Sequence, residues 1–198
     1  MKNPTRTGGP GAAPSEPLLG TPVAHPQPAP ARGGSPSRNA TLDRAREIAA
    51  SVPDPEIPAV TIADLGILRG VTLDGGSIVV QLTPTYTGCP AVLAIELAVE
   101  AALREAGFAD VRIERVLSPA WSTDEITPAG REKLREYGIA PPVRRGTKGA
   151  RLFASETVAC PRCGSTHTSR ISEFGSTACK ALWRCEACRE PFDYFKCL

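Results

Sequence analysis

Two pairs of cysteines near the end of the chain have the spacing of a metal site. Two residues separate the members of each pair, and twenty-one residues separate the pairs, which are Cys160 with Cys163 and Cys185 with Cys188. A two-residue gap lets both thiolates of a pair reach one ion, and the second pair completes a tetrahedron. Four thiolates leave no open position, so the spacing predicts a structural site. Zinc is the first expectation, and iron also suits four thiolates.

Cys179 and Cys197 lie in the same region but outside this pattern. Free cysteines are often buried as small apolar residues, which is the favoured interpretation here. The alternative is that they are additional thiols near the metal that could hold a cluster. The chain has seven cysteines, six of them after residue 159, and an odd, clustered set favours metal binding in a reducing compartment over disulfides.

Cys89 stands alone between a predicted strand and a predicted helix, at the end of the segment 83–90. Pro90 suits the first helical position, which would place Cys89 at the helix cap, beside unpaired amides and the positive end of the dipole. Such surroundings stabilise a thiolate, and Gly88 allows a ligand or partner to approach the sulfur closely. The residue types alone leave a reactive thiol and an inert core residue equally open.

Asp54 and Glu56 are acidic groups that could handle a metal or protons. An Asp-Pro-Glu sequence before a turn is more often a cap with a solvated neighbour, so the residues alone favour a structural role. The two histidines fall in the proline-rich start and in the cysteine-rich region, so neither is expected to act as a base for Cys89. The chain also has no phosphate loop and no metalloprotease motif, which indicates that it is not an enzyme.

The periodicity of apolar residues predicts the elements that position these groups. Helices are expected over 41–51, 90–106 and 127–137, and strands over 65–73, 77–82 and 111–116. The Asp74-Gly75-Gly76 turn should pair the first two strands antiparallel, and the long second helix should cover the sheet. The order α-β-β-α-β-α predicts a small two-layer domain of the α+β class, followed by a four-cysteine, zinc-ribbon-like domain.

Composition divides the chain into segments. Residues 1–40 contain nine prolines and six glycines, which predicts a disordered extension. The first domain is expected over 41–142, a flexible linker over 143–154 and the ribbon over 155–198. The ribbon is too small to fold on an apolar core alone, so metal binding should stabilise it.

Charge and hydropathy restrict the location and the partners. No apolar run resembles a secretory signal or a membrane span, so a cytoplasmic protein without a membrane partner is expected. The net charge of +2 gives no basic field that would indicate a nucleic-acid partner. Aromatic residues of the ribbon could stack on bases, but they are expected to form its small core instead: Trp183, Phe192, Tyr194 and Phe195.

Motifs across residues 42–140 resemble the SufT-like family of iron–sulfur assembly factors. They are Asp54-Pro55-Glu56-Ile57-Pro58, Ile62-Ala63-Asp64-Leu65-Gly66-Ile67, Thr83-Pro84-Thr85 and Gly88-Cys89-Pro90. Four further segments resemble the PaaD family of phenylacetate-degradation proteins, namely 117–121, 138–142, 174–182 and 192–197. Cys179 and Cys197 both fit this second pattern, which favours a role beyond packing for them.

The resemblance implies an accessory factor that matures the multicomponent phenylacetyl-CoA epoxidase without catalysing epoxidation. In this interpretation Cys89, with Asp54 and Glu56, transfers iron or a transient iron–sulfur cluster, and the ribbon docks the recipient. The implied recipient is the diiron oxygenase subunit or the flavin and iron–sulfur reductase subunit, and the iron–sulfur assembly machinery is a further implied partner. Three alternatives stay open: an adaptor that assembles the complex, a thiol-active enzyme using Cys89, and a binding module.

Overall fold

The computed structural model describes residues 37–86, 88–143 and 157–196. Most of the predicted extension and of the predicted linker therefore lies outside the described residues, as does Cys197. Helix α1 (Arg38–Ser51) begins inside the range predicted as disordered, so that prediction is wrong for residues 38–40. The cause is a cap: the Ser37 hydroxyl oxygen accepts a hydrogen bond from the Ala40 N–H at 3.2 Å.

A three-stranded sheet forms the first layer. Strand β1 (Leu68–Asp74) pairs antiparallel with β2 (Ser77–Leu82), and β3 (Val111–Arg115) adds to β2 in parallel, giving the order β1-β2-β3. Gly75 and Gly76 have φ angles of 57° and 102°, as the tightest hairpin turn requires. The antiparallel pair confirms the prediction. Strand β1 begins later than predicted, because residues 61–66 form turns, one of them closed by the bond from the Leu65 N–H to the Thr61 carbonyl.

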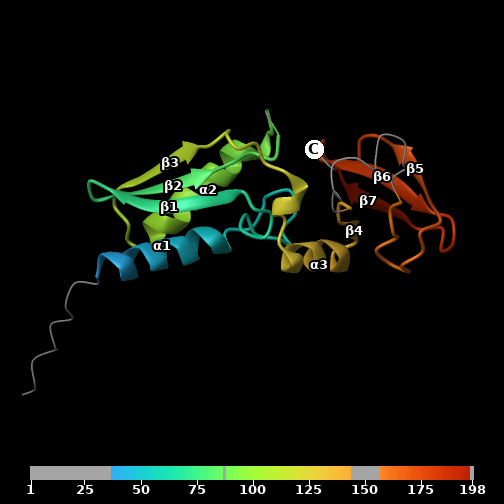
Figure 1. The fold of residues 1–198 in the computed structure, drawn as a ribbon, viewed down its shortest axis with the longest axis horizontal. Coiled ribbons are helices and arrows are strands. Elements are labelled where there is room, and N and C mark those ends of the chain that lie inside the picture. The colour runs from blue at the N-terminus through green and yellow to red at the C-terminus, as the bar shows by residue number, and fades with distance from the viewer. Residues whose placement is uncertain (1–36, 87, 144–156, 197–198) are drawn as a thin grey trace, which may run out of the picture. The chain divides into compact units, whose positions relative to one another are not determined.

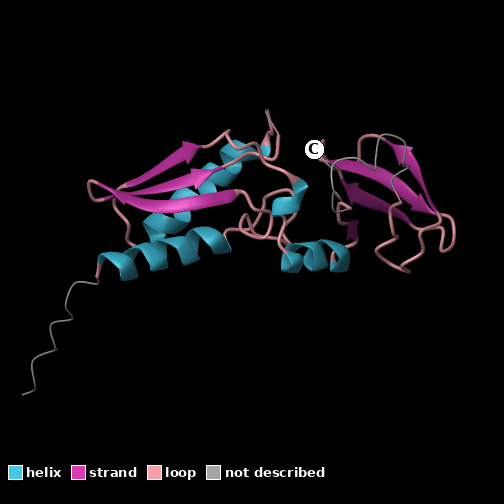
Figure 2. Cartoon of the chain, viewed as in Figure 1, coloured by secondary structure: helices cyan, strands magenta, loops and turns pink. Residues whose placement is uncertain are grey.

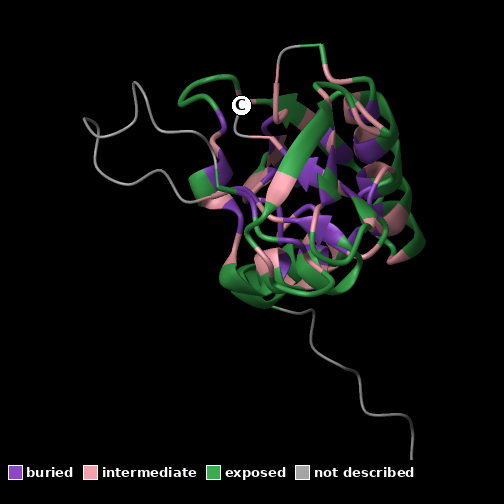
Figure 3. Cartoon of the chain, turned by 90° about the vertical axis from the view of Figure 1, so that its right-hand side faces the viewer, coloured by how far each residue is buried: buried purple, intermediate pink, exposed green. Residues whose placement is uncertain are grey.

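Helices form the second layer. α1 and α2 (Ala91–Glu105) lie on one face of the sheet, as Figures 1 and 2 show. α2 buries Ile95, Val99 and Leu103, which recur every four residues and pack against sheet residues such as Val80 in one apolar core. In Figure 3 the buried residues gather between the elements and the outward surfaces of the helices are exposed. The two-layer α+β architecture is therefore confirmed.

A short segment joins the sheet to the cysteine-rich part. It contains the 3₁₀ turn η1 (Thr123–Glu125), helix α3 (Pro128–Glu136) and strand β4 (Ile139–Ala140). The Thr127 hydroxyl caps α3 by accepting a hydrogen bond from the Gly130 N–H at 2.9 Å. The third predicted helix is therefore found at its expected place.

The ribbon is a small sheet with its own core. Its strands are β5 (Thr168–Ser172), β6 (Lys180–Cys185) and β7 (Pro191–Phe195), and the sheet order is β4-β7-β6-β5. Trp183, Phe192 and Tyr194 belong to the ribbon core, as predicted. Phe195 does not: it packs in the larger core, with its ring centroid 6.2 Å from that of Trp121. The end of β7 therefore reaches the first part of the chain.

No helix among the described residues is long and apolar enough to cross a membrane.

Candidate functional site

The four ribbon cysteines converge on one point. All their sulfur atoms lie within 4.8 Å of one another, with 3.8 Å between Cys160 and Cys188 and 3.6 Å between Cys163 and Cys185. A tetrahedral zinc with Zn–S bonds of about 2.3 Å separates its sulfurs by about 3.8 Å. The distances therefore fit a four-thiolate metal site, and these residues would hold the ion.

Backbone amides prepare one of these thiols to ionise. The Cys188 N–H points at the Cys185 sulfur across 3.5 Å, and this contact, with the Ala187 N–H, lowers the pKa of Cys185 to about 6. The Ser165 N–H would lower the pKa of Cys163 as well, but hydrogen bonding among the crowded sulfurs raises it to about 12. Metal binding must therefore displace the proton of Cys163, which makes affinity depend on pH.

Asp54 caps the turn that precedes the first strand. One of its carboxylate oxygens accepts hydrogen bonds from the N–H groups of Glu56 at 2.9 Å and Ile57 at 2.8 Å, and the residue is buried. Burial is the main cause that raises the pKa of Asp54, against the lowering effects of these two bonds and of Lys180. Asp54 therefore has the structural, turn-capping role that the residue types favoured. The turn also presents the Glu56 side chain to the pocket described below.

Cys89 lies just outside helix α2. The helix begins at Ala91 and its cap is Pro90, so the prediction that Cys89 caps the helix is wrong. The Cys89 N–H instead donates a hydrogen bond to the Tyr86 carbonyl at 3.2 Å. Glycine suits position 88, because the Gly88 φ of 90° is strained for residues with a side chain. The Cys89 side chain is half-buried.

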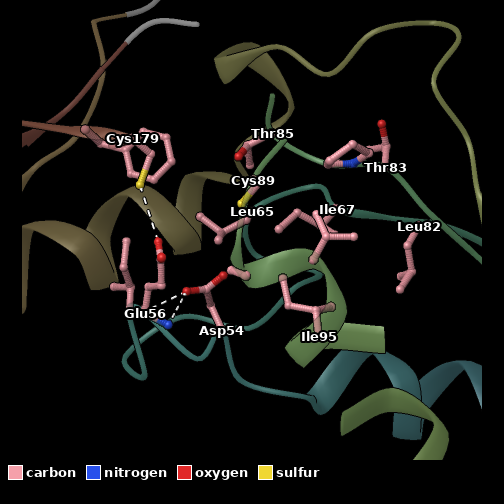
Figure 4. Close-up of a pocket in the computed structure, with 15 residues that line it drawn as sticks. Asp54, Glu56, Leu65, Ile67, Leu82, Thr83, Thr85, Cys89, Ile95 and Cys179 are labelled. Atoms are coloured by element: carbon pink, nitrogen blue, oxygen red, sulfur yellow. Dashed lines mark hydrogen bonds between the residues drawn. The ribbon is translucent and has the colours of Figure 1, made fainter. Parts of the chain in front are cut away.

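A single pocket brings together Cys89, Asp54, Glu56 and, from the ribbon, Cys179. Figure 4 shows the two sulfurs and the two carboxylates around an apolar floor. Five side chains of this floor come from the loop before β1, from β2, from α2 and from β7: Leu65, Ile67, Leu82, Ile95 and Phe195. Two thiols and two carboxylates beside an apolar wall can bind a thiophilic metal and shield it partly from water.

Cys179 lies in this pocket, although its sequence position predicted a place within the ribbon, either as a buried apolar residue or near the ribbon metal. It precedes β6 in the ribbon, yet its sulfur lies 3.8 Å from Glu56 Oε2 and 3.0 Å from Thr177 Oγ1. Burial is the main cause that raises its pKa; the negative charges of Glu56 and Asp54 add to this effect, while Thr177 and Lys180 act in the opposite direction. The thiol is therefore protonated at neutral pH. Its fit to the family pattern was the one signal in the sequence.

Two further residues, at or near the pocket, were not predicted as site residues. Thr83 is 1% exposed and lines the pocket, and its hydroxyl has no hydrogen-bond partner among the described residues. Tyr86 lies close enough to the thiols for its pKa to be raised, first by burial and then by Cys89, Cys179 and Glu56. Both belong to the loop after β2, whose contacts only the folded chain reveals.

Two family models match the chain. The family model described as "Iron-sulfur cluster assembly protein" matches residues 43–114, and the one described as "PaaD zinc beta ribbon domain" matches residues 144–196. The chain is similar to an Escherichia coli K12 protein that is named as the D component of a "Putative 1,2-phenylacetyl-CoA epoxidase". The two are 54% identical over 147 residues, which cover 74% of this chain and 87% of that protein.

Two solved structures are also similar to part of the chain. One is a domain of unknown function, DUF59, from Bacillus anthracis, with 27% identity, coverage of 50% of this chain and 94% of that one, and a TM-score of 0.45. The other is a Mycobacterium tuberculosis protein associated with Fe–S complex assembly and repair, with 31% identity, coverage of 56% and 96%, and a TM-score of 0.28. On its identity to the Escherichia coli protein over most of both chains, the chain belongs to the PaaD family of phenylacetyl-CoA epoxidase components.

Proposed function

We propose that this protein is an accessory factor that helps to insert iron or an iron–sulfur cluster into the phenylacetyl-CoA epoxidase and does not catalyse epoxidation. The observation that supports this most is the pocket in which Cys89, Cys179, Asp54 and Glu56 meet. Thiolates and carboxylates are both iron ligands, and a half-buried thiol can receive a metal and release it again. The cargo in this proposal is iron, alone or within a cluster.

The relatives favour the same proposal. The similar Escherichia coli protein is named as a component of the epoxidase, and the family model over residues 43–114 describes iron–sulfur cluster assembly. A factor of this kind would meet the diiron oxygenase subunit or the flavin and iron–sulfur reductase subunit, and an upstream donor from the assembly machinery. We place this exchange in the cytoplasm, where a reducing environment keeps the pocket thiols available.

The two cysteine groups have different roles in this proposal. The ribbon quartet has no open coordination position, so its ion, zinc or iron, would be retained and would stabilise the ribbon. Cys89 is half-buried at a pocket, where ligand exchange is possible. The ribbon would then dock the recipient while Cys89, aided by Glu56, releases the cargo.

An adaptor that assembles the epoxidase is the second candidate. Leu93 and Leu97 lie one turn apart on α2 and are 59% and 57% exposed, which favours contact with another protein. Replacing both with Gln should abolish co-purification with the epoxidase under the adaptor hypothesis, without changing iron binding. A thiol enzyme is less favoured, because the described lining of the pocket includes no histidine that could act as a base for Cys89.

The test is the iron, sulfide and flavin content of the epoxidase subunits purified from cells. The cells would express the subunits with this protein, without it, or with its Cys89→Ala variant. Maturation predicts that iron or sulfide falls selectively in one subunit when the protein is absent or altered, while flavin is unchanged. Full loading of every subunit in all three cases would exclude maturation and favour the adaptor.

A further inference from the structure

Cys179 differs from the ribbon thiols in what surrounds it. It is 7% exposed and lies outside the quartet of metal-binding sulfurs. Its neighbours are Glu56, which belongs to a turn 123 positions earlier, and Thr177. A cysteine that served only to fill the ribbon core would be surrounded by that core, but Cys179 packs in the larger apolar core of the first part. Its position therefore needs an explanation within the pocket.

We propose that Cys89 and Cys179 act together as ligands of the iron cargo, with the Glu56 carboxylate beside Cys179 adding negative charge that favours the cation. The ribbon then has a second task, which is to complete the cargo site with its own thiol. This inference deepens the proposed function and rests on it for the identity of the metal. It assigns the cargo site to two parts of the chain instead of to the first domain alone.

The contact between Cys179 and Glu56 places a carboxylate beside the sulfur that would bind the iron. The Cys179 thiol donates a hydrogen bond to Glu56 Oε2 across 3.8 Å. When ferrous iron arrives, an Fe–S bond forms, the S–H bond breaks, and the proton is released to solvent. A water ligand leaves the iron, which stays ferrous, so the step needs no oxidant or reductant. Cys89 loses its proton to solvent in the same way, since it is half-buried.

Charge in and around the pocket suits a cation. Glu56 and Asp54 contribute two carboxylates, and two bound thiolates would add two more negative charges. Lys180 opposes this charge: it acts on both Asp54 and Cys179, and it is itself paired with Asp193 at 3.9 Å. A divalent ion, or a cluster with exposed irons, offsets this excess of negative charge, whereas a phosphate or another anion would be repelled.

Thr83 supplies an independent sign of a ligand. Its buried hydroxyl lines the pocket without a hydrogen-bond partner among the described residues. A buried hydroxyl without a partner is costly, so a bound group that accepts its hydrogen bond would be favoured. The sulfide of a cluster or a water on a single iron would satisfy it. Within the described ranges, only the ribbon quartet has its potential ligand atoms gathered around one point. The ligand atoms of the pocket are farther apart, so the cargo must either draw them together or contain more than one iron.

The experiment is an anaerobic titration of the zinc-loaded, full-length protein with two probes, Fe(II) alone and Fe(II) with sulfide. Binding is followed by thiolate-to-iron charge-transfer absorbance and by proton release into a weakly buffered indicator solution. The variants are Cys89→Ser, Cys179→Ser, both together, and Glu56→Gln. Ser176→Ala, a change in the same loop as Cys179, is the matched control. The probe that binds more tightly identifies the cargo as an ion or as a cluster.

The inference predicts that each single cysteine variant weakens binding about tenfold or more and lowers the charge-transfer intensity, and that the double variant does not bind. Glu56→Gln should bind both probes less tightly but keep the absorbance, because a negative charge beside the bound cation is lost while both thiolates remain. The control should behave as the wild type. Wild-type affinity and absorbance in Cys179→Ser would overturn the inference.

A misfolded variant would not leave the question open. Zinc content and circular dichroism report whether Cys179→Ser keeps the ribbon intact. If it does not, alkylation of the wild-type protein decides, and equal labelling of Cys179 with and without bound iron overturns the inference. Its failure also differs from failure of the proposed function. If Cys89→Ala fails to load the recipient but Cys179→Ser binds iron normally, the shared site alone is rejected. If both thiols are needed to bind iron but the recipient is loaded normally in Cys89→Ala, maturation alone is rejected.

Discussion

The Cys179 thiol donates a hydrogen bond to the Glu56 carboxylate across 3.8 Å, and so connects residues that are 123 positions apart. One partner lies in the turn capped by Asp54 and the other precedes strand β6 of the ribbon. The contact brings a thiol of the ribbon to a pocket whose other lining residues, apart from Phe195 of β7, come from the first part of the chain. A change in the folding or the metal content of the ribbon should therefore alter the chemistry of the pocket.

The first prediction concerns the reactivity of Cys179 in the metal-free pocket. Burial and the charge of Glu56 raise the pKa of Cys179, so its thiol should be alkylated slowly at pH 7 and faster as the pH rises above 9. Glu56→Gln removes one of these negative charges, so labelling at pH 8 should become faster. Mass spectrometry of iodoacetamide adducts measures this. Glu173→Gln, at a residue paired with Arg170, is the matched control and should not change the rate.

The second prediction concerns the ribbon metal. Cys185→Ser should lose the bound ion, and because metal binding contributes on the order of 10 kcal/mol to such small domains, the ribbon should unfold. Phe195 and Cys179 would then leave the pocket, so iron binding at Cys89 should weaken as well. Zinc content and near-ultraviolet circular dichroism test this. A variant that lacks zinc but keeps full pocket affinity would show that the ribbon is dispensable for the site.

A third prediction concerns the ion pair that holds α3. The Asp64 carboxylate accepts hydrogen bonds from Lys133 Nζ at 2.7 Å and from the Thr61 N–H at 2.9 Å. Burial would raise the pKa of Asp64, but these bonds outweigh it and lower the pKa. Asp64→Asn should therefore reduce the free energy of unfolding by about 1.5–3 kcal/mol at pH 7.

The pH dependence of this effect has a definite sign. A lowered pKa in the folded state means that the contribution of Asp64 is present above its unfolded value of 3.8 and is lost as the pH falls through its folded value. Urea unfolding of the wild type and of Asp64→Asn should therefore differ at pH 7 and converge below about pH 4. A difference that persists unchanged at pH 3 would contradict the ion-pair account.

Local sequence patterns were sufficient for most of the fold. The glycines at 75 and 76 and the apolar residues of α2 determined the hairpin and the long helix, because these depend on neighbours within a few positions. The cap at Ser37 and the turns before β1 were missed, since short polar segments have no periodicity. Spacing within one segment also identified the four ribbon cysteines, whose sulfurs do converge.

The pocket could be predicted only in part. The resemblance singled out Cys89, Asp54 and Glu56, and the structure places all three around one pocket; their transfer role stays a prediction. That Cys179 faces Glu56, and that the Thr83 hydroxyl is buried without a partner among the described residues, depends on tertiary contacts between distant segments. No local pattern encodes such contacts. The helix-cap position expected for Cys89 was wrong because Pro90 takes it.

The most direct test of the central claim is transfer of iron from the purified protein to an iron-free epoxidase subunit. The protein would be loaded with isotopically labelled iron and mixed with each subunit in the presence of a chelator that captures free iron. The account predicts that label reaches one subunit from the wild type and not from the Cys89→Ser variant mixed with the same iron. Equal uptake from both samples, or label that ends entirely in the chelator, would contradict it.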